Sequence, residues 1–429
     1  MSHQRMSLSP TADNTNSTVA AARVIWHFSQ VWFAEFPERS PDKRINIWGN
    51  SFGGLWCTAT AAHFVAQNNK VAAGQIEGIE LPLDTVGFTN GFIDALYQAE
   101  WYPEFAYNNT YGLEVIQHDV YKAAHHNFTK AGGCRDLIKH CRALGERVGP
   151  ENHNTNSHAN EACVEAYGYC FTYVSGAYDI LSNRSDFDMA HLKPDPGPPL
   201  SNAIGYFNSG PVQEDLGVPV NFTGVSQVIT MNFAATGDTV PFAGLEAMQT
   251  ILDAGVKVAL VYGDRDYRTP WTSAEKISLA FDWSGADDFR NAGYEFVHTN
   301  ASYNGGVVRQ YGNFSFTRMF QAGHGAASYQ PETVIKIFNR VIANLDVATR
   351  TVAINSSSEY TSSGPSSSFY MIDEKLPPPP PVQCYVWNSN NIADRCTDEQ
   401  YAALADGTAV VKDLYVVKPE GVYPGVGGA

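Results

Sequence analysis

Apolar positions recur at helical spacing near the start of the chain and predict an amphipathic helix over residues 18–36. The repeats are three or four residues apart, which places the side chains on one face of an α-helix. Ser17 is suited to cap the first turn, and Pro37 follows the last one. The residues that define the face are Ala21, Ile25, Phe28 and Trp32. We expect this helix to pack on a sheet.

Short apolar stretches of strand length alternate with helical patterns in the first and last parts of the chain. Residues 44–48 alternate like the end of a strand, and an Ala-rich, helix-compatible stretch follows over residues 55–67. The run 256–262 is almost continuously apolar, as buried parallel strands are. Further strands are expected at 84–88 and 314–320, and a later helix carries Val334, Ile337, Phe338, Val341 and Leu345 on one face. The pattern predicts an α/β fold with a mostly parallel central sheet.

The alternation is lost between about residues 98 and 240. Cysteines, glycosylation sequons and a turn-rich run at 193–199 take its place, which predicts an inserted helical lid subdomain. We therefore divide the chain into four parts. Residues 1–97 form the N-terminal part of the core, 98–240 the lid, 241–350 the C-terminal part of the core, and 351–429 a Ser/Pro-rich extension. Within the extension, Pro377 to Pro381 predict polyproline II.

Composition narrows the classes of partner. The chain has 429 residues, 44% of them hydrophobic, which is enough for a large core. Its net charge of −16 argues against nucleic acid or an anionic membrane as a partner. No stretch approaches the apolar length of a membrane span, and the first ten residues lack the apolar region of a signal peptide. The oligomeric state stays open.

The spacing of four cysteines predicts a disulfide-linked helical hairpin. Cys134 and Cys141 lie seven residues apart, as do Cys163 and Cys170, so each pair spans two turns on one helix face. Two antiparallel helices would align Cys134 with Cys170 and Cys141 with Cys163. Of the three possible connectivities, this nested one fits the geometry best.

The other cysteines complete the disulfide pattern. A bond between Cys384 and Cys396 would close a small loop and leave Cys57 free. The alternative is a zinc site, but the sequence contains neither C-x-x-C nor H-E-x-x-H. Disulfides are therefore favoured, and no metal site is expected.

N-glycosylation sequons are more frequent than composition alone would give, which agrees with an oxidising, secretory compartment. They occur at Asn16, Asn108, Asn127, Asn183, Asn221, Asn300, Asn313 and Asn355. The alternative is a set of Asn-rich loops without glycans.

Candidate chemistry begins at residues 47–54, Ile-Trp-Gly-Asn-Ser-Phe-Gly-Gly, which place G-x-S-x-G between a strand and a helix. This arrangement puts a serine on a sharp turn, with its hydroxyl exposed above the sheet. We therefore assign Ser51 as a nucleophile and the backbone N–H of Phe52 as an oxyanion donor. Because the motif also arises by chance, the alternative is a serine in an ordinary surface turn.

An aspartate at 264–266 and His324 follow Ser51 at two later strand ends, in the chain order of α/β-hydrolases. A serine hydroxyl needs a neutral imidazole to take its proton, and the imidazole needs a carboxylate to fix its tautomer. Glycines flank His324, so its loop can bend toward the serine; the alternative is an ordinary loop histidine. This chemistry requires no cofactor.

Together these motifs resemble the serine carboxypeptidases, particularly their fungal members. The resemblance extends from about residue 16 to the C-terminus, and several co-linear motifs make it more specific than any one of them. The matching segments are Gly49-Asn50-Ser51-Phe52-Gly53-Gly54 to G-E-S-Y-[AG]-G, Gly263-Asp264-Arg265-Asp266-Tyr267 to G-D-x-D-[YF], Ala322-Gly323-His324 with Gln330-Pro331-Glu332 to A-G-H and Q-P-E, Gly217-Val218-Pro219, and Tyr178-Asp179-Ile180.

The resemblance implies an α/β-hydrolase fold and removal of C-terminal residues from peptides through an acyl-serine intermediate. It assigns the triad carboxylate to Asp266 and leaves Asp264 a structural role. It also places Asn50 and Gly53 at the substrate. The expected partners are peptides with a free C-terminus, and the expected location is extracellular or vacuolar.

Three departures from the family pattern qualify this reading. Asn50 replaces the family's glutamate; an amide donates a hydrogen bond without protonation, so we expect carboxylate recognition with less acid dependence. Residues 268–271, Arg-Thr-Pro-Trp, replace I-C-N-W. Upstream of the first helix, the segment W-L-N-G-G-P-G, which supplies one oxyanion donor in the family, has no counterpart.

The last departure predicts an N-terminally incomplete chain that aggregates or lacks activity when it is expressed alone, with Phe, Trp and Ile side chains of the first helix partly uncovered. Two other functions therefore stay open. One is an esterase or acyltransferase on the same fold, and the other is a hydrolase-fold fragment whose triad no longer works.

Overall fold

The computed structural model describes residues 15–39, 44–149, 155–193, 195, 203–354, 359–372, 375–379, 384, 386, 396–412 and 415–421. The chain divides into two compact units. We call the described residues within 10–182 and 226–374 the sheet unit, and those within 183–225 and 375–421 the small unit. Each unit is described by itself.

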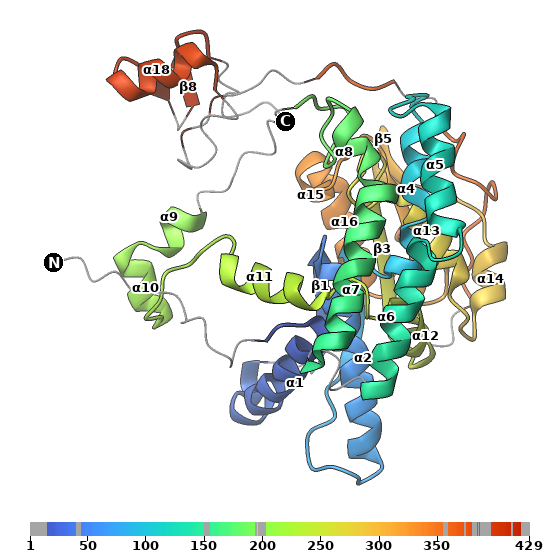
Figure 1. Ribbon diagram of the computed structural model, residues 1–429. Coiled ribbons are helices and arrows are strands. Elements are labelled where there is room, and N and C mark those ends of the chain that lie inside the picture. Colours follow the sequence, from blue (N-terminus) through green and yellow to red (C-terminus); the bar gives the residue numbers. More distant parts are fainter. Residues whose placement is uncertain are drawn as a thin grey trace. The chain divides into compact units, whose positions relative to one another are not determined.

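A six-stranded sheet forms the centre of the sheet unit (Figure 1). Its strands, in spatial order, are β1 (Ile45–Asn50), β2 (Leu83–Thr89), β3 (Lys257–Gly263), β6 (Phe314–Met319), β5 (Tyr303–Tyr311) and β4 (Glu295–Asn300). The first four are mutually parallel, while β5 and β4 are antiparallel. The predicted mostly parallel sheet is thus confirmed, and so are the four strands read from the sequence. The hairpin β4–β5 was not predicted.

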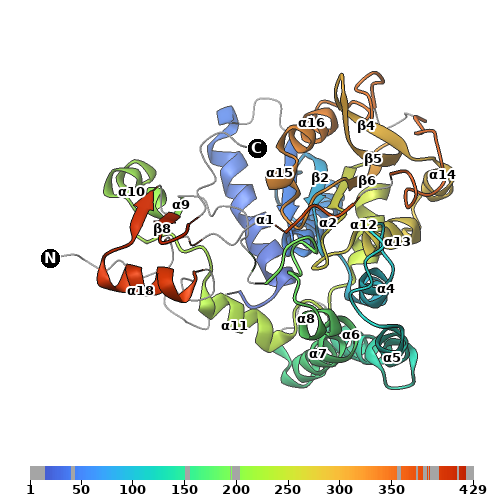
Figure 2. The same cartoon turned by 90° about the horizontal axis from the view of Figure 1, so that it is seen from above.

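Helices cover both faces of the sheet (Figure 2). Neighbouring residues of β1 show the two layers, since side chains alternate across a strand. Trp48 meets Phe338 of α16 (Pro331–Ile342), with ring centroids 5.0 Å apart. Ile47 packs instead with Phe64 of α2 (Gly53–Ala72). The α2 side also holds α1 (Thr18–Glu35), α12 (Gly244–Asp253), α13 (Trp271–Ala280) and α14 (Ala286–Asn291).

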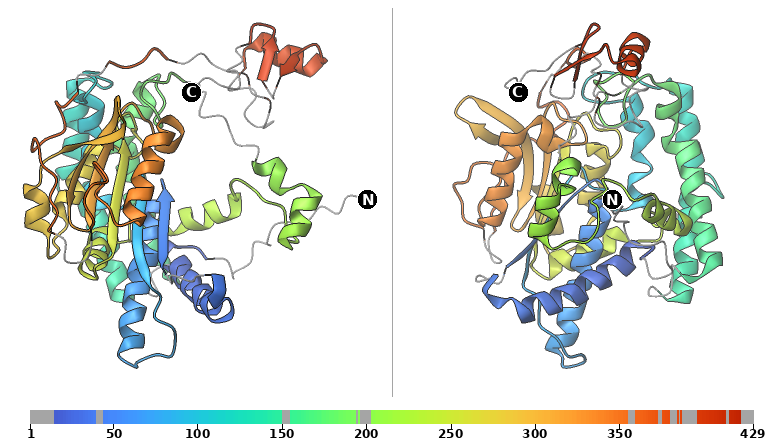
Figure 3. Two further views of the ribbon diagram at one scale, coloured as in Figure 1. Left: turned by 180° about the vertical axis from the view of Figure 1, so that it is seen from behind. Right: turned by 90° about the vertical axis from the view of Figure 1, so that its left-hand side faces the viewer.

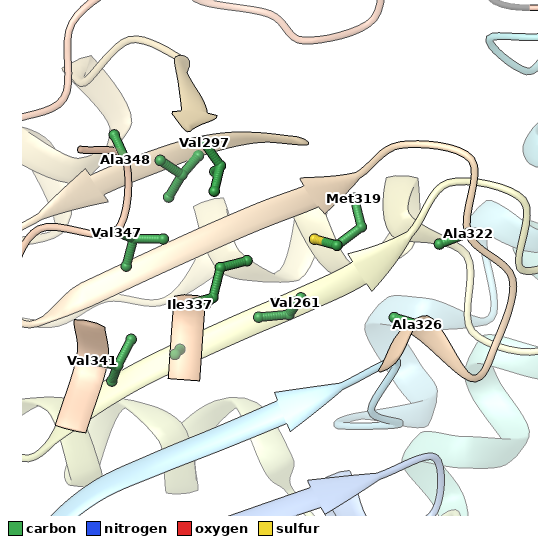
Figure 4. Close-up of a cluster of buried hydrophobic side chains, with 11 residues drawn as sticks. Val261, Val297, Met319, Ala322, Ala326, Ile337, Val341, Val347 and Ala348 are labelled. Atoms are coloured by element: carbon green, nitrogen blue, oxygen red, sulfur yellow. The ribbon is translucent and has the colours of Figure 1, made fainter. Parts of the chain in front are cut away.

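A large core cluster of described residues lies between α16 and the sheet (Figure 4). It confirms the helix predicted from the apolar positions after residue 330, although α16 ends before Leu345. Full burial of a valine, isoleucine or methionine side chain in such a cluster contributes about 1.5–3 kcal/mol to folding. The cluster consists of Ala259, Val261, Val297, Val308, Met319, Ala322, Ala326, Ile337, Val341, Val347 and Ala348.

The predicted first helix is present, with Ser17 as its cap. The Ser17 hydroxyl accepts a hydrogen bond from the N–H of Ala20, as an N-cap does. The side that packs against α2 holds Ala22 and Trp26 rather than the apolar positions used for the prediction. Three of those, Ile25, Phe28 and Trp32, are 37%, 63% and 38% exposed, which confirms the expectation that Phe, Trp and Ile side chains of this helix are partly uncovered. The strand β1 beside this layer is an edge of the sheet (Figure 3).

The region between β2 and β3 is helical where it belongs to the sheet unit. It contains α3 (Ala95–Gln98), α4 (Trp101–Tyr107), α5 (His118–Thr129), α6 (Cys134–Val148), α7 (Ser157–Cys170), a π-helical turn η3 (Phe171–Ser175), α8 (Ala177–Leu181) and α11 (Gln227–Thr236). Disulfides Cys134–Cys170 and Cys141–Cys163 join α6 to α7. These are the pairs that the spacing predicts. Cys134, Cys141 and Cys163 are buried in a core cluster with Phe128 and Ile138, and the partly buried Cys170 packs against it.

The small unit contains α9 (Ala203–Phe207), α10 (Gly210–Leu216), α18 (Asp398–Asp406) and a hairpin of β7 (Val410–Lys412) and β8 (Tyr415–Lys418). A third disulfide joins Cys384 to Cys396, as the sequence predicts. A capping box between Thr397 and Gln400 begins α18.

Several sequence predictions are not decided by this architecture. The boundaries at 97, 240 and 350 remain predictions. Asn355 and the last two residues of the proline run lie outside the described residues. Among the described helices, none has both the length and the apolar character to cross a bilayer.

Candidate active site

The turn between β1 and α2 holds Ser51 in a left-handed backbone conformation, with φ of 61°. A non-glycine residue in this region costs free energy and is typical of a strained nucleophile turn. Two glycines permit the tight geometry. A Cβ on Gly49 would lie 2.7 Å from Cys57 Sγ, and one on Gly54 would lie 2.4 Å from the carbonyl oxygen of Phe92. Gly53, by contrast, has open space where its Cβ would be.

An acyl-transfer reaction needs a hydroxyl and backbone N–H groups on this turn, and within the described residues these groups make no hydrogen bonds to the protein. The Ser51 hydroxyl makes no hydrogen bond there, and the structure records none between it and His324. The backbone N–H groups of Phe52 and Gly53, at the start of α2, donate to no protein acceptor in the same part of the chain. Catalytic hydrogen bonds are often long before substrate binds, so this geometry is compatible with a nucleophile.

His324 and Asp266 are in contact, from loops that follow β6 and β3. His324 Nδ1 lies 2.8 Å from Asp266 Oδ2, and both side chains are buried. Because β1, β3 and β6 are parallel, Ser51, Asp266 and His324 all follow the carboxyl ends of strands at one edge of the sheet. A carboxylate at Nδ1 fixes the imidazole with Nε2 available for the serine proton.

Two further residues hold the Asp266 carboxylate, and sequence reasoning did not assign them a role. Asn90 Nδ2 donates to Asp266 Oδ2 at 2.7 Å, and Thr269 Oγ1 donates to the same oxygen at 2.6 Å. Asn90 follows β2 with φ of 50°, a conformation that asparagine tolerates. Its place in Thr89-Asn90-Gly91 after a strand was the available signal. Thr269 belongs to the segment that departs from the family pattern.

Asp264 is not in contact with His324 in any recorded bond and instead pairs with Arg318. Both side chains are fully buried, with Arg318 Nη2 3.1 Å from Asp264 Oδ2. Tyr111 donates to the other carboxylate oxygen at 2.7 Å. Burial raises the pKa of the Asp264 carboxyl, while Arg318 and Tyr111 act in the opposite direction. This environment suits the structural role expected for Asp264.

The helical region is tied to the Asp266 loop through two tyrosines. Tyr178 stacks on Tyr267, with ring centroids 3.9 Å apart, and the Tyr267 hydroxyl donates to the carbonyl of Ser175 at 2.7 Å. Of the Tyr178-Asp179-Ile180 tripeptide singled out in the sequence, Tyr178 therefore has a packing function next to the site.

Asn50, the residue before the nucleophile, is exposed but uses its amide N–H groups inside the protein. Its Nδ2 donates to the carbonyl of Thr89 at 2.8 Å and to the carbonyl of His324 at 3.2 Å. The Thr89 hydroxyl also lies within 3.1 Å. Both amide hydrogens of Asn50 therefore have protein acceptors in this structure, and its expected contact with the substrate stays a prediction.

An apolar cavity of about 370 Å³ begins beside the nucleophile turn. Its volume is in the range of small-molecule and side-chain pockets. Three aromatic rings meet there. The ring centroid of Phe233 in α11 lies 6.2 Å from that of Phe52 and 6.1 Å from that of Trp56. The cavity is lined by Phe52, Trp56, Tyr167, Ile229, Thr230, Phe233, Ala234, Gly237, Asp238 and Thr239.

Cys57, the cysteine left free by the predicted pairing, is buried beneath the turn. Burial raises the pKa of its thiol to about 12, so the thiolate needed for reactivity is not formed at neutral pH. Cys57 is therefore a packing residue beside Gly49.

Asp238 borders the apolar cavity and also anchors α1. Its Oδ1 accepts the backbone N–H of Thr18 at 2.8 Å, and its other oxygen accepts the Thr18 hydroxyl. Burial raises the pKa of the Asp238 carboxyl to about 6, against the opposing effect of the Thr18 bonds. A second cavity, of about 420 Å³, reaches Asp238 from the side of His63, Arg142 and Glu146.

This raised pKa predicts that Asp238 stabilises the fold more in acid than at neutral pH. Its contribution should be fully present below about pH 3.8 and lost as the pH rises through about 6, since only the folded state keeps the proton in that window. The difference corresponds to about 3 kcal/mol. Urea unfolding of the protein and of Asp238→Asn at pH 4 and pH 7 tests it. A stability difference between the two proteins that is the same at both pH values would contradict the assignment.

Comparison with known proteins agrees with this geometry. A family model described as serine carboxypeptidase matches residues 6–344. Carboxypeptidase S1 homolog B of Arthroderma otae is 41% identical over 407 residues, which are 92% of this chain and 61% of the relative. Carboxypeptidase S1 homolog A of Trichophyton rubrum is 41% identical over 414 residues, covering 94% and 62%. The chain thus spans about three fifths of the length of these relatives.

A solved structure shares the fold. It is the crystal structure of Kex1(delta)p, a prohormone-processing carboxypeptidase from Saccharomyces cerevisiae, with a TM-score of 0.51 and 17% identity over 75% of this chain and 67% of that one. The predicted α/β-hydrolase fold is confirmed by this likeness.

Proposed function

Since this chain belongs to the serine carboxypeptidase family, we propose that it is a serine-type carboxypeptidase that removes C-terminal residues from peptides. The observation that carries the proposal is the buried contact between His324 Nδ1 and Asp266 Oδ2, at the same sheet edge as the strained Ser51 turn. A fold or a family name alone does not establish an activity. The contact between a histidine base and the carboxylate that orients it is direct evidence from the site itself.

In the proposed reaction, His324 Nε2 takes the Ser51 proton as Oγ attacks the last peptide carbonyl. Asp266, held by Asn90 and Thr269, keeps the imidazole in the required tautomer and stabilises the imidazolium. The N–H groups of Phe52 and Gly53 are available for the oxyanion, and the positive end of α2 favours negative charge there. His324 then protonates the leaving amine, and water hydrolyses the acyl-serine.

The apolar cavity supports a preference for a large apolar residue next to the cleaved bond. Its walls are aromatic and aliphatic, and it begins at Phe52, the neighbour of the nucleophile. Filling such a cavity removes apolar surface from water at about 25 cal/mol per Å². A charged substrate side chain would lose its hydration in this cavity. The one carboxyl group among the described lining residues is that of Asp238.

A secretory or vacuolar location completes the proposal. Three disulfides are present in the structure, and they persist in oxidising compartments. The exposed sequon asparagines among the described residues are Asn108, Asn183, Asn221 and Asn300.

The function is tested at pH 5 with a fluorophosphonate probe and three substrates: a blocked dipeptide with an apolar last residue, the same peptide extended by a blocked C-terminal residue, and a simple acyl ester. A carboxypeptidase labels at one serine and releases the last residue of the first substrate at least tenfold faster than it cleaves the internal bond of the second. Preference for the ester by a similar factor would indicate an esterase, and absence of labelling would indicate a hydrolase-fold fragment whose triad does not work.

A further inference from the structure

The apolar cavity beside the nucleophile turn and the second cavity follow one another along α2. Phe52 and Trp56 line the first cavity, while Ala59 and His63 line the second. Trp56, Ala59 and His63 are spaced by three and four residues, so they lie on one face of the helix. This face of α2 is therefore a wall of both cavities.

The segment that begins with α11 forms a second wall in the same order. Residues between 229 and 239 line the first cavity, and residues between 236 and 243 line the second. Asp238 lines both and is held by Thr18 at the start of α1. All of these residues belong to the sheet unit. Two walls that pass both cavities in the same order indicate one groove, which starts at the neighbour of the nucleophile.

The length of this groove suits an extended peptide. The proposed function places the residue before the cleaved bond in the first cavity, so the rest of the acyl part of the substrate continues from there. The rise of α2 puts Ala59 about 10 Å and His63 about 16 Å along the helix axis from Phe52. An extended chain covers about 3.3 Å per residue, so about the fourth to sixth residues before the cleaved bond reach the second cavity.

The charged groups that line the second cavity favour a cation. Arg142 of α6 is already balanced, since its Nη2 lies 2.8 Å from the buried Asp94 carboxylate. Its guanidinium also donates to the carbonyls of Val240 and Phe242. Glu146, one turn further along α6, is exposed, and its carboxylate has no hydrogen-bond or ion-pair partner in the described part of the chain. An ammonium group there would make a charge-assisted hydrogen bond.

We propose that the groove binds the acyl part of an oligopeptide substrate of about five to seven residues, and that Glu146 receives a protonated amine of that peptide. Val19, Ala22, Ala59 and Ala62 line the second cavity with small apolar side chains, which leave room for a peptide main chain. The amine is either the substrate's N-terminal α-ammonium group or a lysine side chain. This inference rests on the proposed function and names its substrate class.

A length series tests the groove. The substrates share their last two residues and are extended with alanine to two, four and seven residues, all acetylated at the N-terminus. The value of kcat/KM should change by less than about threefold from the dipeptide to the tetrapeptide and rise at least about tenfold to the heptapeptide, because only the heptapeptide reaches the second cavity. Equal values for all three lengths would overturn the proposal.

Two further heptapeptides identify the amine. One has a free N-terminus, and the other is acetylated and begins with lysine. An additional gain of about threefold for one of them shows which amine is bound. Glu146→Gln keeps the shape of the side chain but removes its charge, so it should abolish this gain. Glu161→Gln, at an exposed position of α7 outside both cavities, should keep it. A gain for neither peptide, or one that survives Glu146→Gln, contradicts the role of Glu146.

Filling the second cavity gives an independent test. Ala62→Leu adds volume at the α2 wall, so the heptapeptide-to-dipeptide ratio of kcat/KM should fall toward one. Ala66→Leu, at an exposed position of the same helix that lines neither cavity, should keep the ratio. Calorimetric binding of both acetylated peptides to Ser51→Ala gives the same comparison without turnover.

The proposed function and this inference fail in different ways. Absence of both fluorophosphonate labelling and dipeptide cleavage would exclude the function, while tighter binding of the heptapeptide would still support the groove. Normal dipeptide cleavage without any dependence on peptide length would exclude the groove and leave the function in place.

Discussion

Replacing Ser51 with alanine should abolish fluorophosphonate labelling and lower kcat/KM for a blocked dipeptide by about 10⁵–10⁶-fold. In the proposed mechanism the acyl intermediate forms on the Ser51 oxygen, so without it the remaining groups can only assist direct attack by water. Mass spectrometry of the labelled protein and steady-state kinetics measure the two effects. Ser328→Ala, an exposed serine in α15 (Ala326–Tyr329) near His324, should change neither.

A second substitution at the same position separates the chemistry from the strain. Ser51→Gly also removes the hydroxyl, but glycine adopts φ of 61° without a Cβ penalty. Its free energy of unfolding should therefore exceed that of the unmodified protein by about 1 kcal/mol. If labelling persisted in both variants, Ser51 would not be the nucleophile, whatever the effect on stability.

Replacing Asp264 with asparagine should destabilise the fold by about 3–5 kcal/mol, because the fully buried Arg318 loses its counter-charge. Replacing Asp266 with asparagine should have the opposite profile. It should lower kcat/KM by about 10⁴-fold, since an amide no longer fixes the His324 tautomer. Urea unfolding and kinetics on both variants make the comparison.

Asp287→Asn provides the matched control, because that carboxylate is on the surface and pairs with Arg290. It should change the free energy of unfolding by less than about 1 kcal/mol and leave the kinetics unaltered. A large loss of activity in Asp264→Asn at a temperature where it remains folded would reverse the roles assigned to the two aspartates.

The helix α1 shows which structural features the hydrophobic periodicity of a sequence can predict. The helix and its Ser17 cap follow from spacing and residue type alone, and both are present. The partly uncovered Phe28 was also expected, but the contact of Ala22 and Trp26 with α2 does not follow from the spacing. Periodicity locates an apolar stripe on a helix, but the partner that covers it belongs to another part of the fold.

The hairpin β4–β5 is a part of the sheet that the sequence pattern did not predict. Its strands extend the sheet in the antiparallel sense beyond β6, and no pattern used here marked them. β5 carries Gly305, Gly306 and the buried polar side chains of Arg309 and Gln310, which break an apolar run. The Arg309 guanidinium donates to the carbonyl of Ser366 and lies over the Tyr294 ring, while the Gln310 side-chain oxygen accepts the N–H of Val347 at 2.9 Å, and these partners are distant in sequence.

By itself the sequence determined what depends on neighbours within a few residues: the strand–turn–helix around Ser51, the order of the three triad candidates, and cysteines two helical turns apart that pair across a hairpin. The tertiary structure decided what depends on chain segments meeting. It brought Asn90 and Thr269 to the Asp266 carboxylate and turned the Asn50 amide toward the His324 carbonyl. The physical reason is that periodicity and turn chemistry are local, whereas the direction of a hydrogen bond depends on which distant acceptor the fold places beside the donor.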